Sequence, residues 1–298
     1  MERFVSQLVC EPKETKISLT VAQKTNLDGF PKAAELIEIT GAHALEASDR
    51  AILNLLYQFA HDSGRLTEVG ARWKIPMGAL RPSPHESNDR LRQSLDRLLA
   101  VKVNVSYRDR ETGEPRLLMT NLFDGFDIPR PGSNSGLPSF VRFTLPEMLR
   151  PILAQSGRWG RIKAEIVCAM TSKYAIALYE MVQLRAKLDR CVEQFPVERF
   201  RELLGVPPGT YESGSNFVHR VLEVAAIEVN GLSEMGVKIE VVRQSPRAPI
   251  TAVTLAWWRK QGDDYRAAVA ERNRSKEGRM ARLRDTVETT TPLPLAAV

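Results

Sequence analysis

The sequence contains no long apolar run. None of its segments approaches the roughly 18 consecutive apolar residues that a membrane-spanning helix requires. The N-terminus, MERFVSQLVCEPKETK, also lacks the extended apolar core of a secretory signal peptide. These absences predict a cytoplasmic protein that has no membrane partner.

The chain is poor in the residues that bind metals or form disulfides. It has three cysteines and four histidines, and none of them forms a CxxC motif or a Cys/His cluster. Isolated cysteines favour reduced thiols in the cytoplasm, and isolated histidines argue against a metal site. The residues concerned are Cys10, Cys168, Cys191, His43, His61, His85 and His219.

Motifs that carry common catalytic chemistry are missing as well. The sequence has no GxxxxGK[ST] loop for nucleotide phosphates, no HExxH and no GxSxG. The His cluster with a nucleophilic Tyr that a rolling-circle nickase needs is also absent. We therefore expect a protein that is not an enzyme and needs no cofactor.

The composition is that of an ordinary globular protein. Its 298 residues, 43% of them hydrophobic, favour two domains with substantial cores. There are 42 Lys and Arg residues against 36 Asp and Glu, which gives a net charge of +6 and a pI of about 9.3. This moderate excess permits a polyanionic partner but does not require one.

The first half of the chain shows a helix, a break, a second helix and a hairpin. After a short predicted strand at 35–40, apolar residues at helical spacing predict helices over 46–63 and 87–100. The alternating valines from Val101 then predict a strand, followed by the hairpin tip RDRETGEPR and a return strand.

The second half repeats this order. A short extended segment, CVEQFP, precedes the helix VERFRELLGV, a turn, the helix NFVHRVLEVAAIEVN and a hairpin around Ser245–Pro249. A helix-turn-helix followed by a β-hairpin is the winged-helix plan, in which the second helix fits the DNA major groove. The predicted fold class is α+β, with two tandem winged-helix domains.

These patterns divide the chain into four parts. Residues 1–34 are predicted to be a flexible arm, 35–165 the first winged-helix domain and 166–260 the second. Residues 261–298 are predicted to be a basic and largely disordered tail that contains some helix.

Four segments of the second half resemble a known family. SKYAIALYEMVQL, FPVERFRELLGVPPGTY, NFVHRVLEVAAIEVN and VKIEVVRQ with APITAVTLAW together resemble the C-terminal winged helix of iteron-binding plasmid replication initiators. The resemblance covers about residues 170–258, while 35–165 is similar chiefly in length, in element order and in FTLPEMLRPIL.

The resemblance implies a function and a set of partners. Members of this family bind iterons, the direct repeats of a plasmid origin, as monomers in double-stranded DNA. The second domain reads the repeat, and the first adds DNA contacts and forms the interface of an autorepressing dimer. The resemblance also implies host replication helicase and host initiator proteins as partners.

The resemblance also indicates which residues contact DNA. In the second domain the expected reading edge is the start of the helix, with Asn216 serving first as its cap. Glu223 follows one turn later and could accept from a cytosine amino group, but is otherwise interpreted as solvated or paired with an Arg. Arg243 and Arg247 belong to the wing, and Lys173 lies on the helix that crosses the DNA backbone. The reading-edge residues are Ser213, Ser215, Asn216, His219 and Arg220.

The first domain offers a second set of candidates. Arg90, Gln93 and Arg97 share the polar face of the helix over 87–100, which is otherwise interpreted as a solvated surface. Lys102, Arg108 and Arg110 belong to the predicted hairpin and are expected to contact phosphate as a wing.

Two other functions fit the same fold. A winged-helix transcription repressor would use the same residues on a palindromic operator. A protein-interaction scaffold would use the fold without DNA, because fold alone does not determine function.

Overall fold

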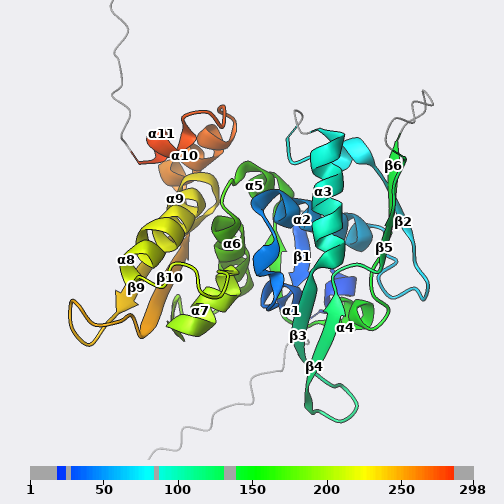
Figure 1. Cartoon of the computed structure of the whole chain (residues 1–298), viewed down its shortest axis with the longest axis horizontal. Helices are drawn as coiled ribbons and strands as arrows, with labels where there is room; N and C mark the ends of the chain where they lie inside the picture. The colour runs from blue at the N-terminus through cyan, green and yellow to red at the C-terminus, as the bar shows by residue number, and fades with distance from the viewer. Residues whose placement is uncertain (1–18, 25–27, 84–86, 131–138, 285–298) are drawn as a thin grey trace, which may run out of the picture.

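The computed structural model describes residues 19–24, 28–83, 87–130 and 139–284. Figure 1 shows two α+β lobes side by side, one drawn from blue to green and the other from green to red. In the described part of the chain, no helix combines the length and the apolar character needed to cross a membrane.

The second lobe is a winged helix. Its sheet is antiparallel with strand order β8-β10-β9, and the register places Leu255 opposite both Glu193 and Ile239. The elements in chain order are α6 (Lys173–Arg185), β8 (Val192–Pro196), α7 (Val197–Leu204), α8 (Gly214–Phe217), the π-helical turn η4 (Val218–Leu222), α9 (Glu223–Leu232), β9 (Met235–Val242) and β10 (Ala252–Arg259).

The helix formed by α8, η4 and α9 is held by its apolar face. Burying each large apolar side chain of this face contributes roughly 1.5–3 kcal/mol, which is sufficient to hold the helix against α6. On the sheet, Trp257 is buried and Trp258 is exposed, as alternation along a strand requires. The buried residues of the helix face are Phe217, Val221, Leu222, Ala225, Val229 and Leu232.

The first lobe repeats this architecture. Its three-stranded sheet has the order β2-β6-β5, which is equivalent to β8-β10-β9 in the second lobe. The elements in chain order are α2 (Ala47–Asp62), β2 (Trp73–Pro76), the 3-10 helix η3 (Met77–Leu80), α3 (Asn88–Ala100), β5 (Gly125–Asp127) and β6 (Phe140–Thr144).

The wing of the first lobe is not the hairpin predicted from the sequence. By strand order, the wing is the connection between β5 and β6, of which residues 131–138 lie outside the described part. The predicted hairpin, β3 (Lys102–Arg108) and β4 (Pro115–Asn121), forms a separate two-stranded sheet inserted between α3 and β5. Because α3 runs on into β3, the hairpin tip lies far from the start of α3 (Figure 1).

The N-terminal boundary also differs from the prediction. Within the predicted arm, η1 (Val21–Gln23) and β1 (Phe30–Ala33) are packed, and Val21 and Phe30 are fully buried. β1 pairs with β7 (Trp159–Ile162), so local sequence pattern alone could not reveal the strand. The strand predicted at 35–40 is wrong, because α1 (Ala34–Ile37) is helical and only Thr40 forms an isolated bridge, to Asn104; η2 (Ala42–Ala44) follows.

A short break separates the two lobes. After α4 (Leu149–Gln155) and β7 comes α5 (Ala164–Ala169), and Met170, Thr171 and Ser172 then interrupt the helical run before α6. At the other end, α10 (Gly262–Arg272) and α11 (Arg279–Leu283) pack on α9. The prediction of a largely disordered tail is therefore wrong for residues 262–284, and residues 285–298 lie outside the described part of the chain.

Candidate nucleic-acid interface

The helix formed by α8, η4 and α9 takes the place of the recognition helix in the winged-helix plan of the second lobe, and we call it the second recognition helix. The turn that leads into it is held by several contacts. Gly205 ends α7 in the left-handed conformation, with φ of 71°. The guanidinium of Arg201 donates hydrogen bonds to the carbonyl oxygens of Thr210 and Tyr211, the latter at 3.2 Å. Arg201 also lies 4.6 Å from the ring of Phe217. The start of the recognition helix is thus fixed by a residue that the sequence analysis did not select.

The helix begins earlier than predicted. Ser213 is the N-cap residue, and the helix starts at Gly214, so the prediction that Asn216 caps it is wrong. Asn216 is the third helical residue, and its side chain is exposed beside those of Ser213 and Ser215. The structure therefore brings the predicted polar residues of the reading edge to one surface.

His219 and Arg220 lie in the π-helical turn η4. Single π turns inside α-helices occur frequently at functional sites. His219 Nδ1 lies 2.9 Å from Glu223 Oε2, and both side chains are exposed. Glu223 is therefore engaged by His219 one turn away, which leaves Arg220 as the cation of this turn that faces solvent.

Arg220 has no carboxylate partner within 4.0 Å among the described residues. It lines a surface depression with Lys173, Tyr174 and Tyr211. Tyr211 has a φ of 52°, which is uncommon for a residue other than glycine, and such conformations cluster at functional sites. A guanidinium held at this edge can donate to base edges or to phosphate.

The second wing approaches the start of the recognition helix. Arg243 Nη1 donates to the Ala248 carbonyl at 2.6 Å and so closes the wing loop. A Cβ placed on Gly214 would lie 2.8 Å from Arg243 Nη2, which shows how closely the wing meets α8. Arg247 is exposed at the tip. Both predicted residues therefore belong to the wing, but Arg243 is only partly exposed, and DNA contact by either residue stays a prediction.

Lys173 is less available than predicted. Its Nζ donates to the His43 carbonyl of the first lobe at 3.0 Å. Burial lowers its pKa, although the nearby Glu46 carboxylate opposes that shift. Lys173 therefore contributes to the contact between the lobes, and DNA contact by this residue stays a prediction.

The predicted DNA-contact residues of α3, the recognition helix of the first lobe, differ in how free their side chains are to contact DNA. Ser87 caps the helix by accepting a hydrogen bond from Arg90 N at 3.3 Å, and Arg90 and Gln93 are exposed. Arg97 instead forms a bidentate pair with Asp49, which is fully buried, at 2.7 and 2.8 Å. The Arg97 guanidinium thus fastens α3 to α2.

The three hairpin candidates do not form a wing. Arg110 donates to the Gln155 carbonyl at the end of α4, and Arg108 donates to the Gly113 carbonyl at 2.5 Å. Lys102 is exposed at the start of β3. By contrast, Arg92, which is not among the predicted contacts, donates to the Pro129 carbonyl at 2.8 Å and so ties α3 to the first residues of the true wing.

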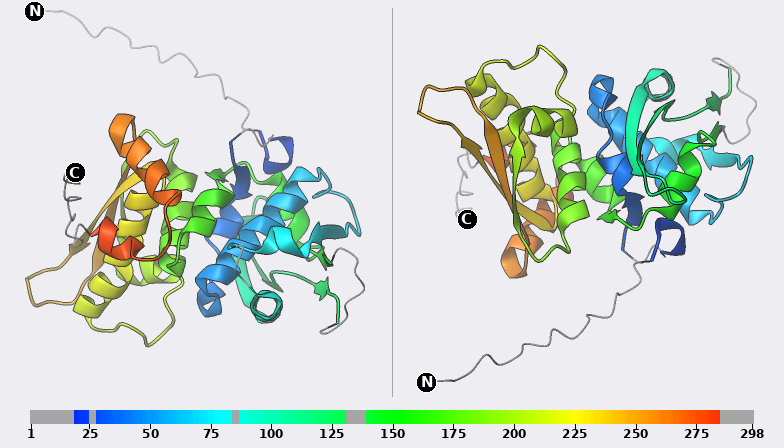
Figure 2. Two further views of the ribbon diagram at one scale, coloured as in Figure 1. Left: turned by 90° about the horizontal axis from the view of Figure 1, so that it is seen from above. Right: turned by 90° about the horizontal axis from the view of Figure 1, so that it is seen from below.

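The two recognition helices share one side of the molecule. Viewed from above and from below, α3 and the loop before α8 lie on one side, and η1 and α10 lie on the other (Figure 2). One DNA duplex can therefore approach both helices without passing around the protein.

Comparison with known proteins identifies the family of the chain. A family model described as "Initiator Replication protein, WH1" matches residues 32–183, more than half of the chain, and one described as "Initiator Rep protein, WH2" matches 196–257. No curated protein sequence matches the chain.

One solved structure similar to this chain is entitled "Crystal structure of Pi initiator protein in complex with iteron DNA". It is 16% identical, covers 78% of this chain and 97% of its own, and superposes with a TM-score of 0.56. At this identity the likeness concerns the fold. Together with the two family matches, it shows that the chain belongs to the Rep family of replication initiator proteins.

Proposed function

We propose that the protein initiates plasmid replication by binding direct repeats, the iterons of an origin, in double-stranded DNA. The observation that carries this proposal is the exposed polar edge at Ser213–Arg220, in which Arg220 has no carboxylate partner among the described residues. The similar Pi initiator protein is described in complex with iteron DNA, which supports the same class of ligand here.

The proposed mechanism is readout without catalysis. The start of α8 and the η4 turn enter a major groove, where Asn216 and Arg220 meet base edges. Arg247 meets phosphate at the neighbouring backbone, and Arg90 and Gln93 of α3 contact the adjacent helical turn of the duplex. Bound monomers then distort the origin, and host replication helicase and initiator proteins are recruited in the cytoplasm.

A second copy of the chain is proposed as a further partner. The outer edge of β4 has no paired strand among the described residues, and Leu117 and Met119 are exposed along it. An open strand edge with apolar side chains is a template for pairing with another chain. We infer that two first domains associate through β4 to form the dimer that represses its own gene.

Gel-shift titration on DNA upstream of the protein's own gene tests the proposed function. Binding of monomers to direct repeats should give a ladder of shifted bands whose number follows the number of repeats. A single band on a palindrome would favour a transcription repressor instead. If no salt-sensitive shift appears, the protein is not a DNA-binding protein, since phosphate contacts make affinity depend on salt.

A further inference from the structure

The α10–α11 segment lies beyond the part of the second domain that the family model matches, which ends at residue 257. It follows β10 and packs beside α9, close to α5 (Figure 1). Glu271 joins its two helices, because the Glu271 carboxylate accepts hydrogen bonds from Arg282 Nε and Nη2 at 3.1 and 2.7 Å. The segment therefore has a defined structure of its own.

The α10–α11 segment contacts the end of the second recognition helix through a hydrogen bond and through packing. Arg272 Nη1 donates to the Leu232 carbonyl at 3.0 Å, which satisfies one of the unpaired carbonyls at the end of α9. Leu283 packs directly on Gly231, where a Cβ would come within 2.3 Å of Leu283 Cδ2. A methyl group at position 231 would therefore require the Leu283 side chain to shift.

The α10–α11 segment also donates hydrogen bonds to the end of the first lobe. Arg279 is 3% exposed, and its Nη1 donates to the Ala169 carbonyl at 2.8 Å. Lys276 Nζ donates to the Cys168 carbonyl at 2.8 Å. Both carbonyls belong to the last turn of α5, immediately before the break that joins the lobes.

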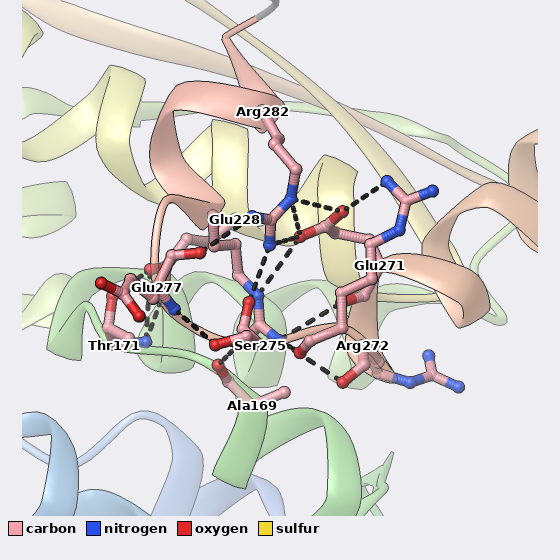
Figure 3. Close-up of polar contacts among 10 residues, drawn as sticks. Ala169, Thr171, Glu228, Glu271, Arg272, Ser275, Glu277 and Arg282 are labelled. Atoms are coloured by element: carbon pink, nitrogen blue, oxygen red, sulfur yellow. Dashed lines mark hydrogen bonds and ion pairs between the residues drawn. The ribbon is translucent and has the colours of Figure 1, made fainter. Parts of the chain in front are cut away.

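The second recognition helix also forms hydrogen bonds to residues 170–172, the break between α5 and α6. Glu228 of α9 is 1% exposed, and its Oε2 accepts hydrogen bonds from Thr171 N and Ser172 N, each at 3.0 Å. The hydroxyl of Thr171 donates to the same carboxylate (Figure 3). A carboxylate at the start of α6 also interacts favourably with the helix dipole.

We propose that Glu228 and Arg279 are positioning residues that fix the angle and separation of the two DNA-reading helices. Rotation of one lobe about residues 170–172 would break charge-assisted hydrogen bonds made by two buried side chains. Such bonds are costly to leave unmade, because neither charge can find water in its place. We call the contacts of Glu228 and Arg279 with residues 169–172 the linker clasp.

The linker clasp has a consequence for specificity that rests on the proposed function. A rigid two-domain reader engages both helices only when the two recognised DNA segments have the correct spacing. The second contact then gains from a high effective concentration, which is lost when the geometry is wrong. The clasp should therefore make the protein select repeats by internal spacing as well as by base sequence.

A distance measurement without DNA tests the clasp directly. Spin labels at the exposed positions Asp96 on α3 and Glu198 on α7 report the separation of the lobes, in protein whose native cysteines have been replaced. The parent protein should give a narrow distance distribution. Arg279→Met and Glu228→Gln should each broaden it. Arg266→Met is the matched control, because Arg266 is an exposed α10 residue whose side chain pairs with Asp263.

Unchanged widths in both clasp variants would overturn the proposal. Two variants are used because Arg279→Met removes packing as well as hydrogen bonds, whereas Glu228→Gln is isosteric. Circular dichroism verifies that each variant is folded. Because the distance measurement needs no DNA, its result does not depend on the proposed function.

Binding to spacing variants of the repeat then tests specificity. The preference of the parent for the native spacing over a repeat with one inserted base pair should fall about tenfold in Arg279→Met and stay unchanged in Arg266→Met. An equal fall in Arg279→Met and Arg266→Met would show that the spacing preference depends on the net charge of the segment, and would overturn a role for the linker clasp in it. If the parent binds no repeat at all, the proposed function fails while the distance result stands.

Discussion

At the scale of single residues, Arg220 should carry sequence preference. Its guanidinium lies in the η4 turn of the recognition helix and has no carboxylate partner among the described residues. We expect Arg220→Ala to weaken binding to the specific repeat by about 1–3 kcal/mol, the usual value of a bidentate base contact. Binding to random DNA should be unaffected. Fluorescence anisotropy titrations at one fixed salt concentration measure both affinities.

Arg266→Ala provides the control for this prediction, since it removes the same charge from an exposed site in α10. If Arg220→Ala weakens specific and random DNA equally, Arg220 contacts phosphate rather than a base. If neither affinity changes, Arg220 does not contact DNA.

The arginines show how far sequence reasoning reaches at this scale. Arg97 and Arg220 both lie on the polar side of an amphipathic helix, and helical spacing treats them alike. The structure separates them, because Asp49 from a distant helix pairs with Arg97. Arg279 lies in the segment that is predicted to be a basic tail, yet it is buried and donates to carbonyl groups of α5 and of the end of α10 and the residues after it. Partners that are remote in sequence leave no local pattern.

At the scale of elements, the second domain could be predicted almost completely and the first only in part. In the second domain β8 and β9 each follow a helix and β10 follows β9 directly, so element order reveals topology. In the first, β3 and β4 interrupt this order, and β5 is only Gly125–Asp127. A short strand has too few residues for its alternation to be recognised. Of the apolar face that helical spacing predicts on α3, Leu91, Leu95 and Leu98 are buried and Leu99 is half-buried.

The exposed edge of β4 predicts the behaviour of the protein in solution. Leu117 is 57% and Met119 is 77% exposed, and we propose that a second copy covers both side chains. Met119→Glu should shift the equilibrium from dimer to monomer, because dimer formation would bury a charge without a partner. Sedimentation velocity over a range of protein concentrations measures the shift.

Leu188→Glu is the matched control, since Leu188 is another exposed apolar residue, at 54%, located outside the hairpin. The dimer interface lies elsewhere if Leu188→Glu dissociates the dimer and Met119→Glu does not. The monomeric variant should retain DNA binding, because the recognition helices do not include β4.

Glu271 makes the α10–α11 segment sensitive to acid. The hydrogen bond from Arg282 lowers the pKa of Glu271 below its ordinary value of 4.5. A carboxyl group whose pKa is lower in the folded state stabilises the fold above pH 4.5, and this contribution is lost as the pH falls through the folded-state pKa. Glu271→Gln should therefore lower the free energy of unfolding by about 1–3 kcal/mol at pH 7.

The difference between the parent and Glu271→Gln should shrink as the pH falls below 4.5 and passes through the folded-state pKa. Urea denaturation at several pH values measures it. A difference that is constant with pH would show that Glu271 contributes by packing rather than by its charge.

At the scale of the whole molecule, the two domains share one core. Buried apolar residues form a continuous cluster from the first lobe into the second. Inside this cluster Lys32 of β1 donates to Glu180 Oε1 of α6 at 2.6 Å, and Asn54 of α2 donates to the same oxygen at 2.7 Å. Burial lowers the pKa of Lys32, and the Glu180 carboxylate opposes that shift. The lobes are therefore joined by a buried ion pair as well as by the linker clasp.

This ion pair predicts how the whole chain unfolds. Glu180→Leu should lower the free energy of unfolding by about 3–5 kcal/mol, because it leaves the Lys32 ammonium buried without its counter-charge. The double variant Lys32→Met with Glu180→Leu should recover part of the loss, since two apolar side chains can replace a buried pair, while the buried Asn54 amide loses its bonds to both residues. Urea denaturation followed by circular dichroism should show a single transition in the parent, because neither lobe can unfold without exposing the other. A Glu180→Leu variant as stable as the parent, or a double variant no more stable than the single one, would show that the pair does not hold the two domains together.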